Sequence, residues 1–283
     1  MSNNSLRLAI DIGGTHLRSR LYEDDNIQEE SQPTAQSDLI EFIQSYLNRY
    51  PNIEFIGISF AGQVKDGTIL SSPNIKVSHL NIKEYFQSRY PNLKLYIDND
   101  LNCAILAESQ YHKQPYISAL FVGTGLGAGV MENNKIIRGY NNQSFELGHI
   151  PYQKAPFACG CGKDNCIELY ASGLGVEKWL TYTNSKYTTK DLQTLIDQKH
   201  PIALQFQTAL LHAIATLITL SNSKTIILGG GVISKNPYLL EYIQKNISTQ
   251  VMPSSLQGVN ILLSSLENAP LDGAGLLDET EFR

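Results

Sequence analysis

The stretch that decides the fold is LAIDIGGTHLRSRLYEDDNIQEE, residues 8–30. Residues 6–12 predict a strand, Gly13-Gly14-Thr15 a tight turn, and residues 17–22 a second strand whose alternate side chains share one face. The same plan returns in ISALFVGTGLGAGVMENNKIIRG, residues 117–139, where an Asn-Asn hairpin turn leads into a third strand. Two copies of one strand–glycine turn–strand plan predict two related domains that face each other.

Strands and helices alternate along the rest of the chain. Further strands are predicted at residues 55–62, 93–98 and 224–233, the last with a glycine turn. Helical spacing covers residues 37–50, with Ser37 as the expected N-cap, and residues 101–112. This alternation predicts an α/β protein with a mixed sheet.

The bulk composition limits the possible classes of function. A chain of 283 residues is too long for a typical single core, so we expect domains at residues 1–116 and 117–267. The net charge of −5 and the lack of a basic stripe argue against nucleic-acid binding. The N-terminus shows no secretory signal, and residues 202–220 fit a buried core helix better than a membrane span. We therefore expect a cytoplasmic protein.

The glycine turns are candidate phosphate sites. Residues 123–128 match the dinucleotide fingerprint on paper, but a hairpin follows where that fingerprint requires a helix, which excludes a Rossmann site. Glycines between strands let backbone N–H groups approach an anion, so the turns at 13–15, 123–127 and 229–231 together favour a bound polyphosphate. Asp11 could hold Mg²⁺ through water. The alternative is that these are merely tight turns.

Three of the four cysteines fall in FACGCGKDNCIE, residues 157–168. Cys159, Cys161 and Cys166 supply three thiolates, and His149 is the natural fourth ligand for a structural, tetrahedral zinc. Redox thiols without metal are the alternative, but clustered cysteines in a cytosolic chain more often hold metal. Cys103 lies on an apolar helix face and fits the core.

Several acids are candidate site residues. Asp100 follows a strand and opens a helix, which suits a base that accepts a hydroxyl proton during phosphoryl transfer, although a simple N-cap is the alternative. Asp98 could play either part. Glu146 and Glu168 flank the cysteine loop. If zinc orders that loop, both carboxylates are fixed in space and can accept hydrogen bonds from sugar hydroxyls. The alternative is that they are two surface acids.

The motifs DIGGTHLR, SFAG…SPNI, IDNDLNCAILAE, FVGTGLGAG, FELGH and CGCGKDNCIE resemble, in order and spacing, the ROK family of sugar kinases and repressors. The resemblance extends from Leu6 to about Leu277 and is nearest to the bacterial glucokinases. It implies an actin/hexokinase-like, ribonuclease H-like fold of two domains, with ATP and sugar in an interdomain cleft. Residues 268–283 would pack back on the first domain.

The resemblance also assigns roles by position. Asp100 matches the catalytic base toward the sugar 6-hydroxyl, and the sugar-binding positions match Asn99, Asp100, Glu146, His149 and Glu168. The zinc ligands match His149, Cys159, Cys161 and Cys166. The nucleotide-binding positions match Asp11, Gly13, Gly14, Thr15, Thr124, Gly125, Gly127, Gly229, Gly230 and Gly231. A homodimer is the family's common form.

Two departures from the family pattern bear on the sugar. The family usually has A-G-E where this chain has Ser144-Phe145-Glu146, and Asn-Gly where it has Asn141-Asn142. Both changes fall where family members contact the sugar.

The expected function is therefore an ATP- and Mg²⁺-dependent hexokinase, with glucose as the first choice of sugar. An N-acetylhexosamine kinase (for N-acetylmannosamine or N-acetylglucosamine) or a fructokinase is the alternative, and a catalytically weak sugar-binding protein has no support because all motif acids are present. A sugar-responsive repressor is less favoured, because the first strand begins near Leu6 and leaves no room for a DNA-reading helix.

Overall fold

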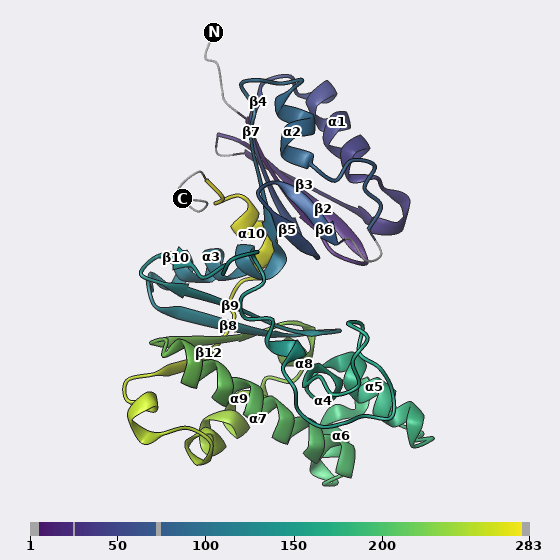
Figure 1. Ribbon diagram of the computed structural model, residues 1–283, viewed down its shortest axis with the longest axis vertical. Helices are drawn as coiled ribbons and strands as arrows, with labels where there is room; N and C mark the ends of the chain where they lie inside the picture. Colours follow the sequence, from purple (N-terminus) through teal and green to yellow (C-terminus); the bar gives the residue numbers. More distant parts are fainter. Residues whose placement is uncertain (1–5, 25, 72–74, 279–283) are drawn as a thin grey trace. The chain divides into compact units, whose positions relative to one another are not determined.

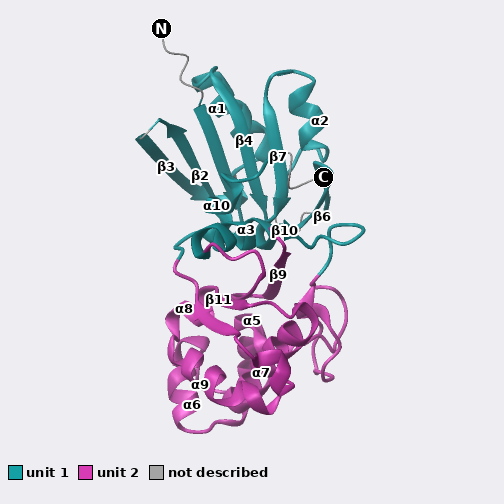
Figure 2. Cartoon of the chain, turned by 90° about the vertical axis from the view of Figure 1, so that its left-hand side faces the viewer, with its two compact units in different colours: residues 1–112, 135–144, 266–283 teal, residues 113–134, 145–265 magenta. Residues whose placement is uncertain are grey.

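The computed structural model of the chain describes residues 6–24, 26–71 and 75–278 and divides into two compact units. Unit 1 comprises residues 1–112, 135–144 and 266–283, and unit 2 comprises residues 113–134 and 145–265 (Figure 2). Figure 1 labels the helices and strands along the chain. Residues 72–74 of the SPNI motif and residues 279–283 of the C-terminal segment lie outside the described residues.

Unit 1 is built on a mixed five-stranded sheet in the order β3-β2-β1-β4-β7. Its strands are β1 (Leu6–Ile12), β2 (His16–Glu23), β3 (Asn26–Pro33), β4 (Ile53–Phe60) and β7 (Lys94–Asn99). The first three strands are antiparallel neighbours, whereas β1, β4 and β7 run parallel. The carboxyl ends of these parallel strands meet at one edge of the sheet, the edge where open α/β sheets place ligands. A small second sheet pairs β5 (Gln63–Lys65) with β6 (Thr68–Ser71).

The helices of unit 1 cover an apolar core formed largely by the strands and α1. They are α1 (Leu39–Arg49), α2 (Ile82–Gln87), α3 (Asp100–His112) and α10 (Ala269–Ala274), with the 3₁₀ turn η1 (Thr34–Gln36). The expected Ser37 cap of α1 is wrong. Asp38 caps the helix, since its Oδ1 accepts a bond of 2.9 Å from the backbone N of Ile40, whereas the Ser37 hydroxyl donates to the carbonyl of Pro33.

Helix α10 lies late in the sequence but belongs to the interior of unit 1. A side chain at Gly273 would place its Cβ 1.8 Å from the carbonyl oxygen of Cys103 on α3, so only glycine permits this approach. On the neighbouring surface Leu271 and Ala274 form a buried cluster with Ala9 of β1. Helix α10, the last described helix, therefore completes the packing against the sheet of unit 1.

Unit 2 repeats the opening plan of unit 1. Its strands β8 (Ile117–Val122) and β9 (Leu126–Glu132) form an antiparallel pair around the glycine turn at 123–125, and β8, β11 (Thr225–Gly229) and β12 (Asn260–Leu263) run parallel. Asn133 and Asn134 both adopt left-handed backbone (φ 51° and 59°), as a two-residue hairpin turn before β10 (Lys135–Ile136) requires. The repeated strand–glycine turn–strand plan is thus confirmed.

The helices of unit 2 surround one long apolar helix. They are α4 (Glu168–Ala171), α5 (Gly173–Tyr182), α6 (Leu192–Asp197), α7 (Pro201–Ser221), α8 (Gly231–Lys235) and α9 (Tyr238–Asn246), with 3₁₀ turns η2 (Leu147–His149), η3 (Thr189–Asp191), η4 (Ile247–Thr249) and η5 (Pro253–Leu256). Helix α7 is long and apolar enough to cross a membrane, but 67% of its most apolar window is buried inside the protein. It packs against α4, α5 and α6 as a core helix.

Candidate active site and metal centre

Asp11 lies near the end of β1, between two polar neighbours that the strand register supplies. Arg18 is its cross-strand partner on β2 and Ser59 its partner on β4. The Ser59 hydroxyl donates to Asp11 Oδ1 at 2.8 Å, and Arg18 Nη1 lies 3.4 Å from Oδ2. Burial raises the pKa of the Asp11 carboxyl, and the contacts with Ser59 and Arg18 oppose this only in part. Asp11 is thus a buried acid whose ionised form remains costly despite the nearby Arg18.

We expect Asp11→Asn to raise the thermal midpoint at pH 7 when nucleotide and Mg²⁺ are absent. Because burial raises the folded-state pKa, Asp11 stabilises the fold fully below its unfolded pKa of about 3.9, and this stability is lost as the pH rises through the folded-state pKa. Asparagine has no ionised form, so its advantage should shrink as the pH falls. Thermal unfolding between pH 7 and pH 4 measures the difference; a less stable variant at pH 7 would contradict the expectation.

The turn after β1 is held by its flanking backbone. Gly13 N donates to His16 O at 2.9 Å, and the Thr34 hydroxyl donates to Gly13 O at 2.7 Å. Thr15 O accepts from Thr34 N at 3.0 Å. At Gly14 a Cβ would meet nothing within 4 Å, so the middle of the turn is open to a ligand.

Asn99 and Asp100 lie at the same carboxyl edge of the sheet, where β7 passes into α3. The Asn99 amide is held on both sides, since its Nδ2 donates to Gly62 O at 3.1 Å and its Oδ1 accepts from Leu101 N at 2.9 Å. Asp100 is the first residue of α3, is partly exposed, and its Oδ1 accepts from Leu101 N at 3.0 Å. A helix N-terminus favours the ionised carboxylate that a proton acceptor needs.

Asp98 differs from Asp100 in its surroundings. Its side chain is fully buried, and Oδ2 accepts from Arg138 Nη2 at 2.7 Å and from Arg138 Nε at 2.9 Å. Its Oδ1 accepts from Asn102 Nδ2 at 2.8 Å and from Asn142 Nδ2 at 2.9 Å. Both oxygens of Asp98 are therefore engaged within unit 1, whereas Asp100 is partly exposed.

Replacing Arg138 should destabilise unit 1 strongly. We expect Arg138→Met to lower the free energy of unfolding by about 3–5 kcal/mol, because it leaves the Asp98 charge buried without its partner. The matched control is Arg49→Met, whose ion pair with Glu30 is half-exposed and should be worth about 1 kcal/mol or less. Urea unfolding of the three proteins measures this. Equal losses in the two variants would show that the Asp98–Arg138 pair does not stabilise the fold.

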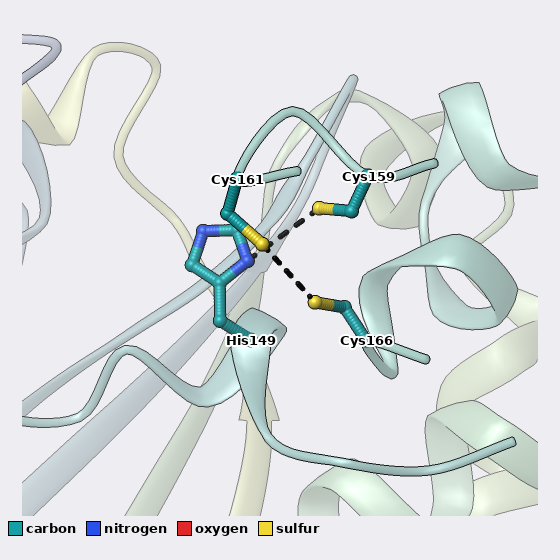
Figure 3. A group of neighbouring side chains, drawn as sticks. All are labelled: His149, Cys159, Cys161 and Cys166. Carbon is teal, nitrogen blue, oxygen red and sulfur yellow. Dashed lines mark hydrogen bonds between the residues drawn. The ribbon is translucent and has the colours of Figure 1, made fainter. Parts of the chain in front are cut away.

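The four metal-ligand candidates come together in unit 2 (Figure 3). His149 comes from η2, and the cysteines from the loop before α4. The ligand atoms all lie within 4.8 Å of one another, with Cys161 Sγ 3.4 Å from Cys166 Sγ and Cys159 Sγ 3.6 Å from His149 Nδ1. A tetrahedral zinc holds such atoms about 3.5–3.8 Å apart, so the set fits a Cys₃His site.

The charge state of the thiols also bears on metal binding. Burial raises the pKa of Cys159 to about 12, whereas a backbone hydrogen bond from Lys163 lowers the pKa of Cys161. A divalent cation would favour the thiolate form of each ligand. Cys159 therefore needs a cation to ionise near neutral pH, whereas Cys161 ionises more readily than an ordinary thiol.

The acids beside this loop differ in their partners. Glu168 begins α4, and its two carboxylate oxygens accept from Leu126 N at 2.9 Å and from Cys159 Sγ at 3.3 Å. Glu146 immediately precedes η2, and burial raises the pKa of its carboxyl, opposed by the nearby His149. The structure thus gathers Glu146, His149 and Glu168 around the cysteine loop.

A cavity of 410 Å³ lies in unit 2 beside the second glycine turn. Thr124 and Gly231 contribute to its wall, whereas Gly125, Gly127, Gly229 and Gly230 are not among its lining residues. Gly230 has a structural reason to be glycine, because its φ is 86° and a Cβ would lie 2.6 Å from Val122 O. The complete lining is Gly123, Thr124, Gly173, Leu174, Val176, Glu177, Thr189, Lys190, Leu192, Gly231, Val232, Lys235 and Asn236.

Sequence comparison identifies the family. The sequence profile of the ROK family matches residues 7–281, almost the whole chain. The chain belongs to the ROK family.

The relatives of this ROK protein include both kinases and a repressor. It is 27% identical over 279 residues to the xylose repressor of Bacillus spizizenii, covering 93% of this chain and 71% of the repressor. It is 27% identical over 276 residues to the N-acetyl-D-glucosamine kinase of Haemophilus influenzae, covering 86% of this chain and 89% of the kinase.

Comparison with solved structures identifies the fold. The ROK family glucokinase from Streptomyces griseus, in complex with glucose and AMPPNP, superposes with a TM-score of 0.73 at 25% identity, covering 98% of this chain and 100% of that chain. The expected actin/hexokinase-like fold is confirmed.

The two departures from the ROK pattern are both left-handed positions. Asn142 has φ 59° and Phe145 φ 58°, both in the left-handed region that favours glycine. Asn142 fixes its conformation with its side chain, which donates to Val64 O at 2.7 Å and accepts from Asn102 Nδ2 at 3.0 Å. Phe145 is bulky, and a bulky residue in this region carries strain, typically about 1–3 kcal/mol. Phe145 is therefore held in a conformation that its residue type does not favour, whereas Asn142 tolerates its own.

Sequence reasoning missed several residues that line the 410 Å³ cavity of this ROK protein. Leu174 and Lys190 belong to α5 and η3, and Lys235 ends α8. Only the glycine-rich run at 173–175 hinted at a close approach of backbone to ligand. Asp98 and Arg138 were missed as a pair because 40 residues separate them in sequence.

Proposed function

We propose that this ROK protein is an ATP-dependent hexokinase that phosphorylates the 6-hydroxyl of a sugar, with glucose as the leading candidate. The observation that carries the proposal is the contrast between two neighbouring acids. Asp98 is buried with both oxygens engaged, whereas Asp100 is partly exposed at the first turn of a helix. The similarity to a glucokinase in complex with glucose and AMPPNP supports the choice of sugar.

In this proposal Asp100 accepts the proton of the 6-hydroxyl as that oxygen attacks the terminal phosphate of ATP. Such a base typically contributes about 10²–10⁴ in rate. Asn99, whose amide is held by backbone groups at both ends, binds the sugar beside the base. Glu146, His149 and Glu168 bind the sugar hydroxyls. An analogue that lacks one of these hydroxyls binds less well, because it leaves the corresponding acceptor without a hydrogen bond.

The nucleotide is assigned to the glycine turns and the 410 Å³ cavity. Within the turns at 13–15 and 124–127, backbone N–H groups other than those of Gly13 and Leu126, which donate inside the fold, bind the phosphates. The turn at 229–231 lies beside adenosine, and Gly231 lines the cavity there. Asp11 would hold, through water, the Mg²⁺ that accompanies ATP and offsets phosphate charge. A structural zinc on His149, Cys159, Cys161 and Cys166 orders the loop that carries the sugar-binding acids. We also propose a cytoplasmic homodimer that binds neither nucleic acid nor membrane.

The direct test is a substrate panel with ATP and Mg²⁺. Hexoses and N-acetylhexosamines are compared by kcat/KM in a coupled assay of ADP release, with product position read by NMR. We expect glucose to lead, with the 6-phosphate as product. A preference for N-acetylglucosamine or N-acetylmannosamine, to which the Haemophilus relative points, or for fructose would reassign the sugar. No phosphorylation of any sugar would refute the kinase.

The similarity to the xylose repressor favours a second candidate, a sugar-responsive repressor. The net charge of −5 counts against it, because phosphate contacts to DNA need a basic surface. A gel-shift assay with operator-like DNA, with and without sugar, tests it; specific binding would revive this candidate.

A further inference from the structure

The second glycine turn is gripped by a single stretch of chain. Gly173 N donates to Gly123 O at 2.8 Å, and Leu174 N donates to Thr124 O at 3.1 Å. On the other side of the turn, Glu168 Oε2 accepts from Leu126 N at 2.9 Å. Residues 168–174 therefore bond to the first two carbonyl groups of the turn, those of Gly123 and Thr124, and to the N–H group of Leu126 at its end.

This grip determines where the remaining N–H groups of the turn point. In a planar trans peptide the N–H points opposite to the C=O that shares the bond. Since the carbonyls of Gly123 and Thr124 face the start of α5, the N–H groups of Thr124 and Gly125 point away from it. Thr124 also lines the 410 Å³ cavity. Two N–H groups are thus arranged as an anion site, and Leu126 N–H is withheld from it.

Glu168 also fits the turn sterically. A Cβ at Gly125 would lie 2.7 Å from Glu168 Oε2, so the glycine makes room for the carboxylate. The other oxygen, Oε1, lies 3.3 Å from Cys159 Sγ, and Cys166 precedes Glu168 by two residues. One side chain therefore contacts both the cysteine loop and the phosphate turn.

We propose that Glu168 is a positioning residue for the nucleotide: its carboxylate joins the cysteine loop to the turn at 123–126 and holds the turn ready for phosphate. This inference rests on the proposed kinase function and goes beyond it, because it makes nucleotide affinity depend on a residue otherwise assigned to the sugar. An ordered cysteine loop then supports phosphate binding before any sugar is present.

The test is the affinity for a non-hydrolysable ATP analogue with Mg²⁺, measured by calorimetry in the absence of sugar. Glu168→Ala should weaken binding about tenfold or more, because it removes a charge-assisted hydrogen bond to the turn. Glu168→Gln keeps an oxygen acceptor for Leu126 N and should stay within a few-fold of the wild type. The control is Glu241→Ala, an exposed acid on α9 of the same unit, which should leave nucleotide affinity unchanged.

Metal content by elemental analysis and amide hydrogen exchange of residues 123–126 accompany each measurement. We expect exchange to rise in Glu168→Ala and to return toward the wild-type level in Glu168→Gln. Unchanged affinity in Glu168→Ala, or an equal loss in Glu168→Ala and Glu168→Gln, would overturn the inference while leaving the kinase proposal standing. A wild-type protein that binds no nucleotide would refute the kinase proposal itself.

Discussion

Asp100→Asn is expected to lower kcat by about 10²–10⁴ while the sugar affinity stays within a few-fold of the wild type. Asparagine keeps the size of the side chain and its oxygen acceptor for Leu101 N, but it cannot take up the proton of the attacking hydroxyl. Steady-state kinetics and sugar calorimetry on the same protein separate the two effects.

The comparison variant is Asp98→Asn. Asp98 is fully buried and paired with Arg138, so this change should appear chiefly as a lower free energy of unfolding. A fully active Asp100→Asn protein would remove Asp100 from the mechanism. If the Asp98→Asn protein is folded and loses more kcat than Asp100→Asn, then Asp98 rather than Asp100 is the base.

Cys161→Ser is expected to abolish stoichiometric zinc binding and to lower the thermal stability of unit 2. Structural zinc in small domains contributes about 10–16 kcal/mol of binding energy, which here orders a loop rather than a whole domain. Because Glu146 and Glu168 flank that loop, the KM for sugar should rise as well. Elemental analysis, thermal unfolding and kinetics measure the three consequences.

Cys103→Ala is the matched control for metal content. Cys103 is fully buried in unit 1 and is not part of the four-residue cluster, so its loss should leave the zinc content unchanged. Purified wild-type protein without bound metal, together with full activity after Cys161→Ser, would contradict the structural zinc. It would leave the redox-thiol interpretation as the better one.

Local patterns in the sequence predicted the parts of the fold that depend on near neighbours. The repeated strand–glycine turn–strand plan was readable because alternation and glycine turns act over a few residues. The cysteine cluster was readable for the same reason, and His149 lies only ten residues before Cys159. Their meeting within 4.8 Å required no long-range information.

The features that escaped prediction depend on distant contacts. The different surroundings of Asp98 and Asp100 follow from Arg138 and Asn142, which contact Asp98 from 40 and 44 residues away in the sequence. No periodicity encodes such a pair. The cap of α1 was misassigned by one residue because serine and aspartate are both good N-caps. The Ser37 hydroxyl instead bonds to Gln32 and Pro33, which leaves Asp38 to cap the helix.

The late position of α10 has a consequence for synthesis on the ribosome. Leu271 and Ala274 seal Ala9 of the first strand, yet more than 250 residues separate them in translation order. During synthesis, the surface around Ala9 on the sheet of unit 1 stays uncovered until residues 271–274 have emerged from the ribosome. A premature stop before residue 266 would therefore leave β1 with an exposed apolar surface that a chaperone could bind.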